Sequence, residues 1–255
     1  MKMADIQDVL ETDRVWCAYA LADLFPPYVD QAAWRWRPDA VVLCYRGFEP
    51  PILFAHGEPA VVAELFDEVA EGLYQFGLLA THRALIQHRW VPRKESRMWR
   101  MVLPAGARPP ATGDAVAPLR QNDLPSLQTL FEGQPDLPDA FHPSQLDDGC
   151  FFGVWEGSHL IAVAGTHVVS QAAGVAAIGN VYTRSDRRGR GLGQSTTAAV
   201  TAELLRREIR TIVLNVAMDN EPALRVYRAL GFMPFCGYYE GVAELKPAPI
   251  PTKET

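Results

Sequence analysis

The sequence predicts an α/β (α+β) protein, and two patterns in its C-terminal half carry that prediction. A strand-like run at residues 175–183 leads through a basic, glycine-rich turn into a long amphipathic helix, and a second strand-like run at 211–216 leads into a shorter helix. A segment rich in proline and glycine, residues 105–114, separates this half from residues 1–104. Because the chain has 255 residues, of which 48% are hydrophobic, it can hold about two domains with buried cores.

The N-terminal part, residues 1–104, is expected to form a smaller domain. Its apolar runs predict strands at residues 41–45, 52–55 and 98–103. Residues 60–70 predict a helix, because Val61, Leu65 and Val69 fall on one side of such a helix.

The C-terminal part, residues 115–246, is expected to form the larger domain, and residues 247–255 a tail. Strand-like runs lie at residues 115–119, 151–155, 160–169, 175–183, 211–216 and 232–245. Helical runs lie at residues 124–131, 194–207 and 220–231. Gly237 is expected to interrupt the last strand.

The turn within residues 181–193 contains four arginines, at positions 184, 187, 188 and 190, and three glycines. Such a turn points unpaired backbone N–H groups at one spot, and the helix that follows adds the positive end of its dipole. The chain as a whole has a net charge of −6, which argues against nucleic-acid binding. A small polyanion, and in particular a pyrophosphate, therefore explains this local basic segment best.

Two other phosphate-binding patterns do not fit the same glycines. A dinucleotide fingerprint that starts at Gly189 requires a third glycine where Gln194 stands. A nucleoside-triphosphate loop ends in Gly-Lys-Ser/Thr, whereas Gly193 is followed by Gln194 and Ser195. The remaining alternative is a plain connection whose arginines are solvated.

The helix that starts near residue 220 has clear start and stop signals. Asp219 or Asn220 can cap its N-terminus, Pro222 suits the first turn, and Gly231 suits the left-handed position just past its end. Asn220, Ala223 and Tyr227 lie at i, i+3 and i+7, so they share one face of this helix.

These two segments together resemble the GNAT acetyltransferase superfamily. Arg188, Gly191 and Gly193 match its Arg/Gln-x-x-Gly-x-Gly/Ala pattern, and Asn220, Ala223 and Tyr227 match its second motif, which ends at Gly231-Phe232. The resemblance implies a mixed, mostly antiparallel sheet flanked by helices, with a parallel strand pair splayed apart around a pantetheine arm.

The same resemblance implies an enzyme, an N-acetyltransferase that uses acetyl-coenzyme A as cosubstrate and attaches the acetyl group to a primary amine by direct attack. The residues expected to bind the cofactor are Val181, Tyr182, Thr183, Arg188, Gly189, Arg190, Gly191, Leu192, Gly193, Gln194, Asn215, Asn220, Ala223 and Tyr227.

Tyr227 is expected to act as the general acid. The departing coenzyme A thiolate needs a proton, and a phenol with a pKa of about 10 is a neutral donor at pH 7. The alternative is a structural tyrosine at the core or its rim, whose hydroxyl is hydrogen-bonded.

No general base stands out in the sequence. His167, Asn180 and Glu240 are candidates on strands, and an ordered water is another; His167 is the candidate that titrates near neutral pH. A histidine among apolar residues can equally be a structural side chain.

The expected partner is a small-molecule amine or an amino acid, with no nucleic acid and no membrane, and the protein is either a monomer or a homodimer. The chain shows no signal peptide and no membrane-spanning run, so we expect a cytoplasmic protein. No metal is expected, because the four cysteines are scattered singly and no His cluster has ligand spacing. An acyl-cysteine route through Cys150 or Cys236 is an alternative mechanism.

Residues 1–104 contain no counterpart of either motif. In length and order of elements they resemble the degenerate N-terminal lobe of glycine N-acyltransferase-like proteins. Two alternative functions stay open: a non-catalytic acyl-coenzyme A sensor, and a nucleotide-binding module that uses the same turn.

Overall fold

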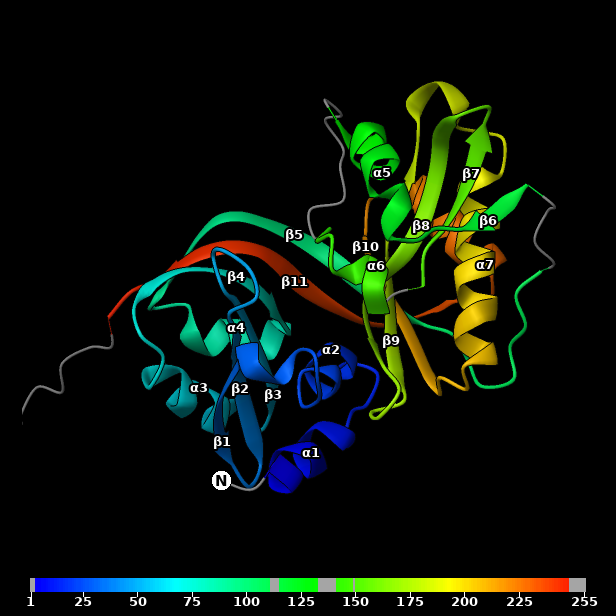
Figure 1. The fold of residues 1–255 in the computed structure, drawn as a ribbon. Coiled ribbons are helices and arrows are strands. Elements are labelled where there is room, and N and C mark those ends of the chain that lie inside the picture. The colour runs from blue at the N-terminus through cyan, green and yellow to red at the C-terminus, as the bar shows by residue number, and fades with distance from the viewer. Residues whose placement is uncertain (1–2, 111–114, 133–140, 149, 248–255) are drawn as a thin grey trace, which may run out of the picture. The chain divides into compact units, whose positions relative to one another are not determined.

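The structure, a computed structural model, describes residues 3–110, 115–132, 141–148 and 150–247 (Figure 1). The chain divides into two compact units. The first unit consists of residues 1–99 and 236–255, and the second of residues 100–235. Strands β5 (Trp90–Val102) and β11 (Met233–Leu245) contribute residues to both.

The first unit contains a mixed sheet with helices. Its helices are α1 (Met3–Glu11), α2 (Ala18–Ala22), α3 (Pro59–Asp67) and α4 (Ala80–Ile86), with a 3-10 helix at Val29–Gln31. Its own strands are β1 (Ala32–Arg37), β2 (Ala40–Tyr45), β3 (Ile52–Gly57) and β4 (Gly72–Leu78). The pairs β1–β2 and β2–β3 are antiparallel, whereas β3 and β4 are parallel and are connected by α3. Strand β11 pairs antiparallel with β4.

The core of the first unit lies between α3, α4 and the sheet. Leu65 and Phe66 of α3 are fully buried against apolar side chains of β2, β3 and β4. The Phe76 and Trp90 rings meet edge to face, with their centroids 4.8 Å apart.

The second unit has the strand order β5-β10-β9-β8-β7-β6. Its own strands are β6 (Val116–Pro118), β7 (Phe152–Glu156), β8 (His159–Ser170), β9 (Val175–Thr183) and β10 (Thr211–Ala217). Its helices are α5 (Leu124–Phe131), α6 (Gln145–Asp148), α7 (Leu192–Arg206) and α8 (Glu221–Ala229), with 3-10 helices at Gln121–Asp123 and Ser185–Arg187. The pairs from β6 to β9 are antiparallel.

Strands β9 and β10 are parallel, as predicted for the pair that flanks the long helix. Their register runs from Thr211 with Val175 to Leu214 with Ile178 and ends there, although both strands continue. Strand β9 is also irregular just beyond this point, because its register with β8 shifts and Asn180 has a positive φ of 53°. The two strands therefore separate in the middle of the second unit.

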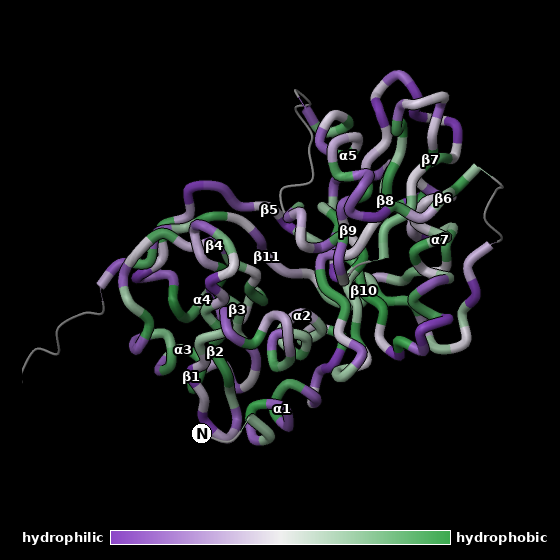
Figure 2. The backbone as a smooth tube through the Cα atoms, viewed as in Figure 1, coloured by the Kyte–Doolittle hydropathy of each residue, from purple (hydrophilic) through white to green (hydrophobic). Residues whose placement is uncertain are grey.

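Helices cover both faces of this sheet. Leu127 and Leu130 of α5 pack against Val163 and Tyr182, whereas Leu192 of α7 packs against the cluster that contains Ala162. Neighbouring residues of a strand point to opposite faces, so α5 and α7 lie on opposite sides of β8. The strands between them are correspondingly apolar along much of their length (Figure 2).

The predicted fold class, a mixed and mostly antiparallel sheet flanked by helices, is confirmed. Among the expected elements, α5 and β9 have the predicted bounds. The expected interruption at Gly237 is wrong, because β11 runs through this glycine from Met233 to Leu245. The compact units also differ from the expected domain boundaries, because the end of β11 groups with the first unit, where residues Tyr239 to Leu245 pair with β4.

Several elements of the first unit were not predicted, namely α1, α2, α4, β1 and β4. Part of the expected linker, residues 111–114, and nearly all of the expected tail lie outside the described residues. Among the helices that the structure describes, none is long and apolar enough to span a bilayer.

Candidate active site

The glycine-rich turn between β9 and α7 has an open, left-handed backbone. Gly189 and Gly191 have φ values of 77° and 75°, and a Cβ at either position would meet no heavy atom within 4 Å. The first hydrogen bond of α7 runs from the Ser195 N–H to the Gly191 carbonyl. The N–H groups of Leu192, Gly193 and Gln194 precede that bond and have no acceptor within the helix. The turn thus presents backbone donors and the positive end of α7 to an anion.

Side chains brace this turn from β9. Arg188 Nε donates to the Thr183 carbonyl over 3.1 Å, and its guanidinium lies 5.7 Å from the centre of the Tyr182 ring. A Cβ on Gly193 would come within 3.3 Å of Thr183 Oγ1, so glycine fits closely there. The structure therefore brings together the predicted residues Tyr182, Thr183, Arg188 and Gly193.

The four arginines of the turn are not equivalent. Arg187 pairs with Glu156 and Asp186 at 2.5 and 2.6 Å, and Arg184 pairs with Asp186 at 2.6 Å. The hydrogen bond from Arg187 holds the pKa of Glu156 below its usual value. These two arginines are neutralised locally. Arg188 and Arg190 are exposed and add positive charge at the same turn.

Helix α8 starts as predicted. Asn220 is its N-cap and accepts a hydrogen bond from the Ala223 N–H over 3.2 Å, and Pro222 lies in the first turn. Gly231 just past the end has the left-handed φ of 92°. Tyr227 is buried on the inner face of this helix.

Burial raises the pKa of Tyr227 to about 12. The phenol therefore keeps its proton at neutral pH, as a proton donor must. The same shift makes it a weaker acid than the free phenol assumed from the sequence, since each pKa unit corresponds to about 1.4 kcal/mol.

His167 occupies a bulge of β8, where the register with β9 shifts between Thr166 and Val168. Its ring fills the space that a side chain at Gly179 would need, since a Cβ there would lie on the imidazole. Burial, and then the positive charge of Arg100, lower the pKa of His167 to about 4. The imidazole is neutral at pH 7, but such a low pKa makes it a weak general base.

Glu240 belongs to the first unit, where its Oε2 accepts a hydrogen bond of 2.6 Å from the Tyr238 hydroxyl. Asn180, in contrast, lies in the second unit where β9 and β10 separate, and its amide donates to Gln145 Oε1 over 3.0 Å. Sequence analysis missed Gln145 and the buried Arg100, because only tertiary contacts bring them to this region.

Burial raises the pKa of the Cys150 thiol to about 12, so its thiolate is scarce at neutral pH and a nucleophilic role is disfavoured. Cys236 is half-buried. In the described part of the chain, no three His, Cys, Asp or Glu side chains form a group that could hold a metal ion.

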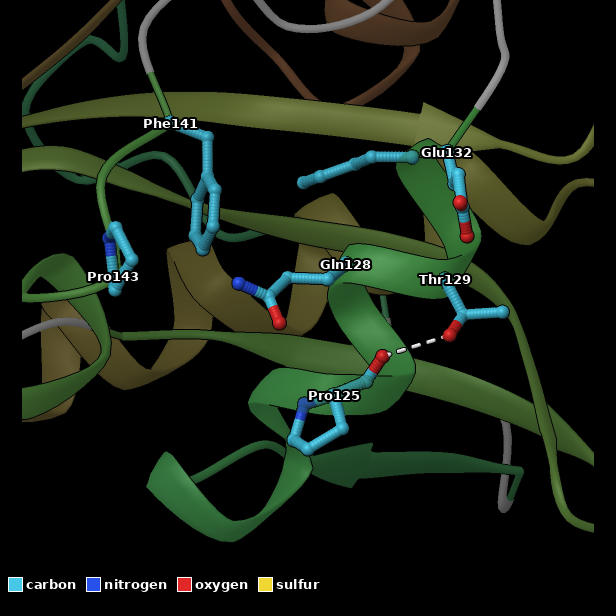
Figure 3. A pocket seen from close by; sticks show the side chains of 7 residues that line it. Pro125, Gln128, Thr129, Glu132, Phe141 and Pro143 are labelled. Atoms are coloured by element: carbon cyan, nitrogen blue, oxygen red, sulfur yellow. Dashed lines mark hydrogen bonds between the residues drawn. The ribbon is translucent and has the colours of Figure 1, made fainter.

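A groove of about 700 Å³ lies along α5 in the same unit (Figure 3). Gln128, Thr129 and Glu132 line one side of it, and Phe141 and Pro143 the other. Figure 3 also shows the Thr129 hydroxyl donating to the Pro125 carbonyl, a bond of 2.9 Å that keeps this hydroxyl on its own helix.

Comparison with known proteins shows that most of the second unit matches a described protein family. The profile of the acetyltransferase (GNAT) family matches residues 119–232, a range that contains both the glycine-rich turn and α8. A curated mycothiol acetyltransferase from Renibacterium salmoninarum is 29% identical over 208 residues, which cover 73% of this chain and 56% of the relative. The chain thus spans only about half the length of that relative.

Solved structures share the fold. A protein described as a GNAT acetyltransferase from Novosphingobium aromaticivorans has a TM-score of 0.64 at 19% identity, with 91% of this chain and 96% of that one covered. A tandem GNAT protein from the clavulanic acid biosynthesis pathway has a TM-score of 0.57 at 13% identity, with 97% and 95% covered. At such identities the likeness concerns the fold alone.

Proposed function

We propose that this chain is an N-acetyltransferase, because the profile of the acetyltransferase (GNAT) family matches residues 119–232. It moves an acetyl group from acetyl-coenzyme A to a primary amine by direct attack in a ternary complex. The observation that carries the proposal is the turn before α7, where open glycines, N–H groups that have no acceptor within the helix, and two exposed arginines lie together.

In this proposal the pyrophosphate of coenzyme A binds to the first turn of α7. The N–H groups of Leu192, Gly193 and Gln194 donate to its oxygens, and Arg188 and Arg190 supply charge. The pantetheine arm runs along β9 toward the place where β9 and β10 separate, and the thioester lies there.

The reaction joins the amine nitrogen to the thioester carbon and breaks the carbon–sulfur bond. The thiolate leaves with the electron pair and takes the proton of the Tyr227 hydroxyl, while the nitrogen gives up its proton to water. The tyrosinate formed in this step then takes a proton back from water, so over the full cycle the proton that the amine loses balances the one delivered to the thiolate. His167, with its low pKa, is a poor acceptor for the amine proton, so we favour an ordered water as base.

The acceptor is a small-molecule amine or an amino acid. Two curated relatives, the one from Renibacterium salmoninarum and one from Catenulispora acidiphila that is 34% identical over 101 residues, are named mycothiol acetyltransferase. The acceptor of those enzymes is therefore the first to test. Because this chain covers only 56% and 32% of these two relatives, other amines remain candidate acceptors.

A second candidate function is a non-catalytic acyl-coenzyme A sensor. The pKa values of the two catalytic candidates favour this function. The pKa of Tyr227 is raised to about 12, which weakens it as an acid, and that of His167 is lowered to about 4, which weakens it as a base. Such a protein would bind the cofactor at the same turn and release no thiol.

The test is a thiol-release assay with acetyl-coenzyme A and an amine panel. The panel contains glycine, lysine, spermidine, glucosamine, kanamycin, a tri-alanine peptide and the acceptor of the mycothiol acetyltransferases. We expect amine-dependent release of coenzyme A with at least one member. Tight binding of acetyl-coenzyme A in calorimetry, with no release above the rate without amine, would support the sensor instead.

A further inference from the structure

Asn180 lies where the two parallel strands separate. The last parallel pair joins Leu214 of β10 to Ile178 of β9, and Asn180 follows two residues later with a φ of 53°. Its side chain is almost completely buried, with 2% of the residue exposed. A buried amide needs partners for its NH₂ group and for its carbonyl oxygen.

Backbone groups, whose roles as donor or acceptor are fixed, determine the orientation of this amide. The His142 N–H donates to Gln145 Oε1 over 3.1 Å, and Gln145 Nε2 donates to the His167 carbonyl over 3.3 Å. Since Gln145 Oε1 is an acceptor, the Asn180 atom 3.0 Å away from it must be the NH₂ nitrogen. That nitrogen also faces the Thr166 carbonyl at 3.5 Å.

The other atom, Asn180 Oδ1, is buried and has no hydrogen-bond partner among the residues that the structure describes. A buried carbonyl oxygen without a donor is unfavourable. A ligand that brings an N–H group to this point therefore gains a hydrogen bond at a position that the fold has already oriented.

We propose that Asn180 Oδ1 accepts a hydrogen bond from the attacking amine of the acceptor, so that Asn180 positions the acceptor and helps to select it. This inference rests on the proposed N-acetyl transfer. An uncharged primary amine has two N–H groups and one lone pair. One N–H binds Oδ1, the lone pair attacks the thioester carbon, and the second N–H is the one whose proton leaves.

The location supports an acceptor rather than the cofactor. The Asn180 side chain is held by Gln145 of α6, and Tyr182, two residues along the strand, packs with α5. The glycine-rich turn precedes α7, which packs on the opposite face. The amide N–H groups of pantetheine are the competing donors, and the experiment separates the two.

The test compares Asn180→Gly, Asn180→Asp and the control Gln171→Ala. Glycine and aspartate both tolerate a φ of 53°, so neither variant adds backbone strain. Glycine removes the acceptor oxygen. Aspartate keeps one, and its second oxygen, which faces Gln145 Oε1 and the Thr166 carbonyl, must carry a proton to donate as the Asn180 amide does, so the variants are compared at acidic pH as well as at neutral pH. Gln171 is exposed and donates to the Arg207 carbonyl, away from the strand separation.

With the panel amine that the wild type acetylates fastest, Asn180→Gly should raise KM for the amine about 3- to 10-fold, the equivalent of one hydrogen bond. Asn180→Asp should stay within about threefold of the wild type, and Gln171→Ala should match it. The calorimetric Kd for acetyl-coenzyme A should stay within about twofold in all three.

Two results would overturn the inference while the proposed function stands. A weaker Kd for acetyl-coenzyme A with an unchanged amine KM would assign the donor to pantetheine, and a lower melting temperature alone would assign Oδ1 a structural role. If the wild type acetylates no amine, the proposed transfer fails. In that case glucosamine is titrated into the wild type and into Asn180→Gly, each saturated with coenzyme A. Equal affinity of the two proteins for glucosamine, or no binding to either, overturns the inference as well.

Discussion

Tyr227 is the residue on which the proposed chemistry depends most directly. If its hydroxyl protonates the leaving thiolate, Tyr227→Phe keeps the ring packing and removes only the proton. Turnover with a saturating amine should then fall about a hundredfold or more, because general acid catalysis contributes roughly that much. The Kd for acetyl-coenzyme A should stay near the wild-type value, because the proton acts in the transition state.

Tyr74→Phe is a matched control for this prediction. Tyr74 is as buried as Tyr227, with 7% and 8% exposed, but it lies in the first unit and its hydroxyl donates to the Ala70 carbonyl. Its variant should lower the melting temperature and leave turnover unchanged. If Tyr227→Phe behaves in the same way, Tyr227 is structural and the catalytic role is withdrawn.

At this scale the sequence predicts single residues well where the signal is local. The Asn220 cap and the left-handed Gly231 follow from their neighbours in the chain, and both are confirmed. The network of Gln145, Asn180 and His167 joins residues 22 and 35 positions apart. No local pattern encodes it, and the direction of the pKa shift of Tyr227 likewise depends on tertiary burial.

Among the elements, the turn between β9 and α7 carries the cofactor prediction. Valine at Gly191 places a β-branched side chain where phosphate oxygens are expected to approach. Each lost charge-assisted hydrogen bond costs about 1.5–3 kcal/mol, so affinity for acetyl-coenzyme A should fall at least about tenfold per bond. Isothermal titration calorimetry on the folded variant measures this loss.

Backbone strain needs its own control, because valine also fits poorly at a φ of 75°. Gly106 has a φ of 79° with open space around it and lies outside the turn. Gly106→Val should reproduce the strain, seen as a lower melting temperature, with unchanged cofactor affinity. Equal affinities of both variants and the wild type would remove the pyrophosphate site from this turn.

A helix or strand could be predicted from the sequence where its own residues show a clear apolar pattern and clear ends. Strand β9 and helix α5 have strong apolar periodicity and clear stops, and their bounds match. Strand β1 alternates half-buried tryptophans with arginines, so only its pairing with β2 defines it. Strand β11 passes through Gly237 because its later residues are held by β4, a partner far away in the chain.

In the whole molecule, one topology occurs twice. In the first unit β3 leads through α3 to the parallel strand β4, and in the second unit β9 leads through α7 to the parallel strand β10. In each unit, three consecutive strands that pair antiparallel come before this crossover. They are β1, β2 and β3 in the first unit and β7, β8 and β9 in the second. The resemblance of the first unit to a degenerate GNAT lobe stays a prediction, and this recurrence is in keeping with it.

The two helix N-termini differ in their suitability for a phosphate. Helix α3 begins at Pro59, which lacks an N–H, and its N-cap is Glu58, whose carboxylate would repel an anion. Gly57, just before them, could carry no side chain, since a Cβ would overlap the backbone of Asp39 and Ala40. Helix α7 instead begins after Gly191, and the N–H groups of its first turn have no acceptor within the helix.

We therefore expect each chain to bind one acetyl-coenzyme A, at the second unit. Calorimetric titration of the wild type should saturate at one molecule per chain, and Gly191→Val should weaken that single transition. The double variant Glu58→Gln and Pro59→Ala restores an N–H and removes the charge at α3, yet it should still bind one, because the glycine-rich turn is missing there. Saturation at two molecules per wild-type chain would mean that the first unit holds a cofactor site of a different construction, since residues 1–104 contain no copy of the phosphate-binding pattern.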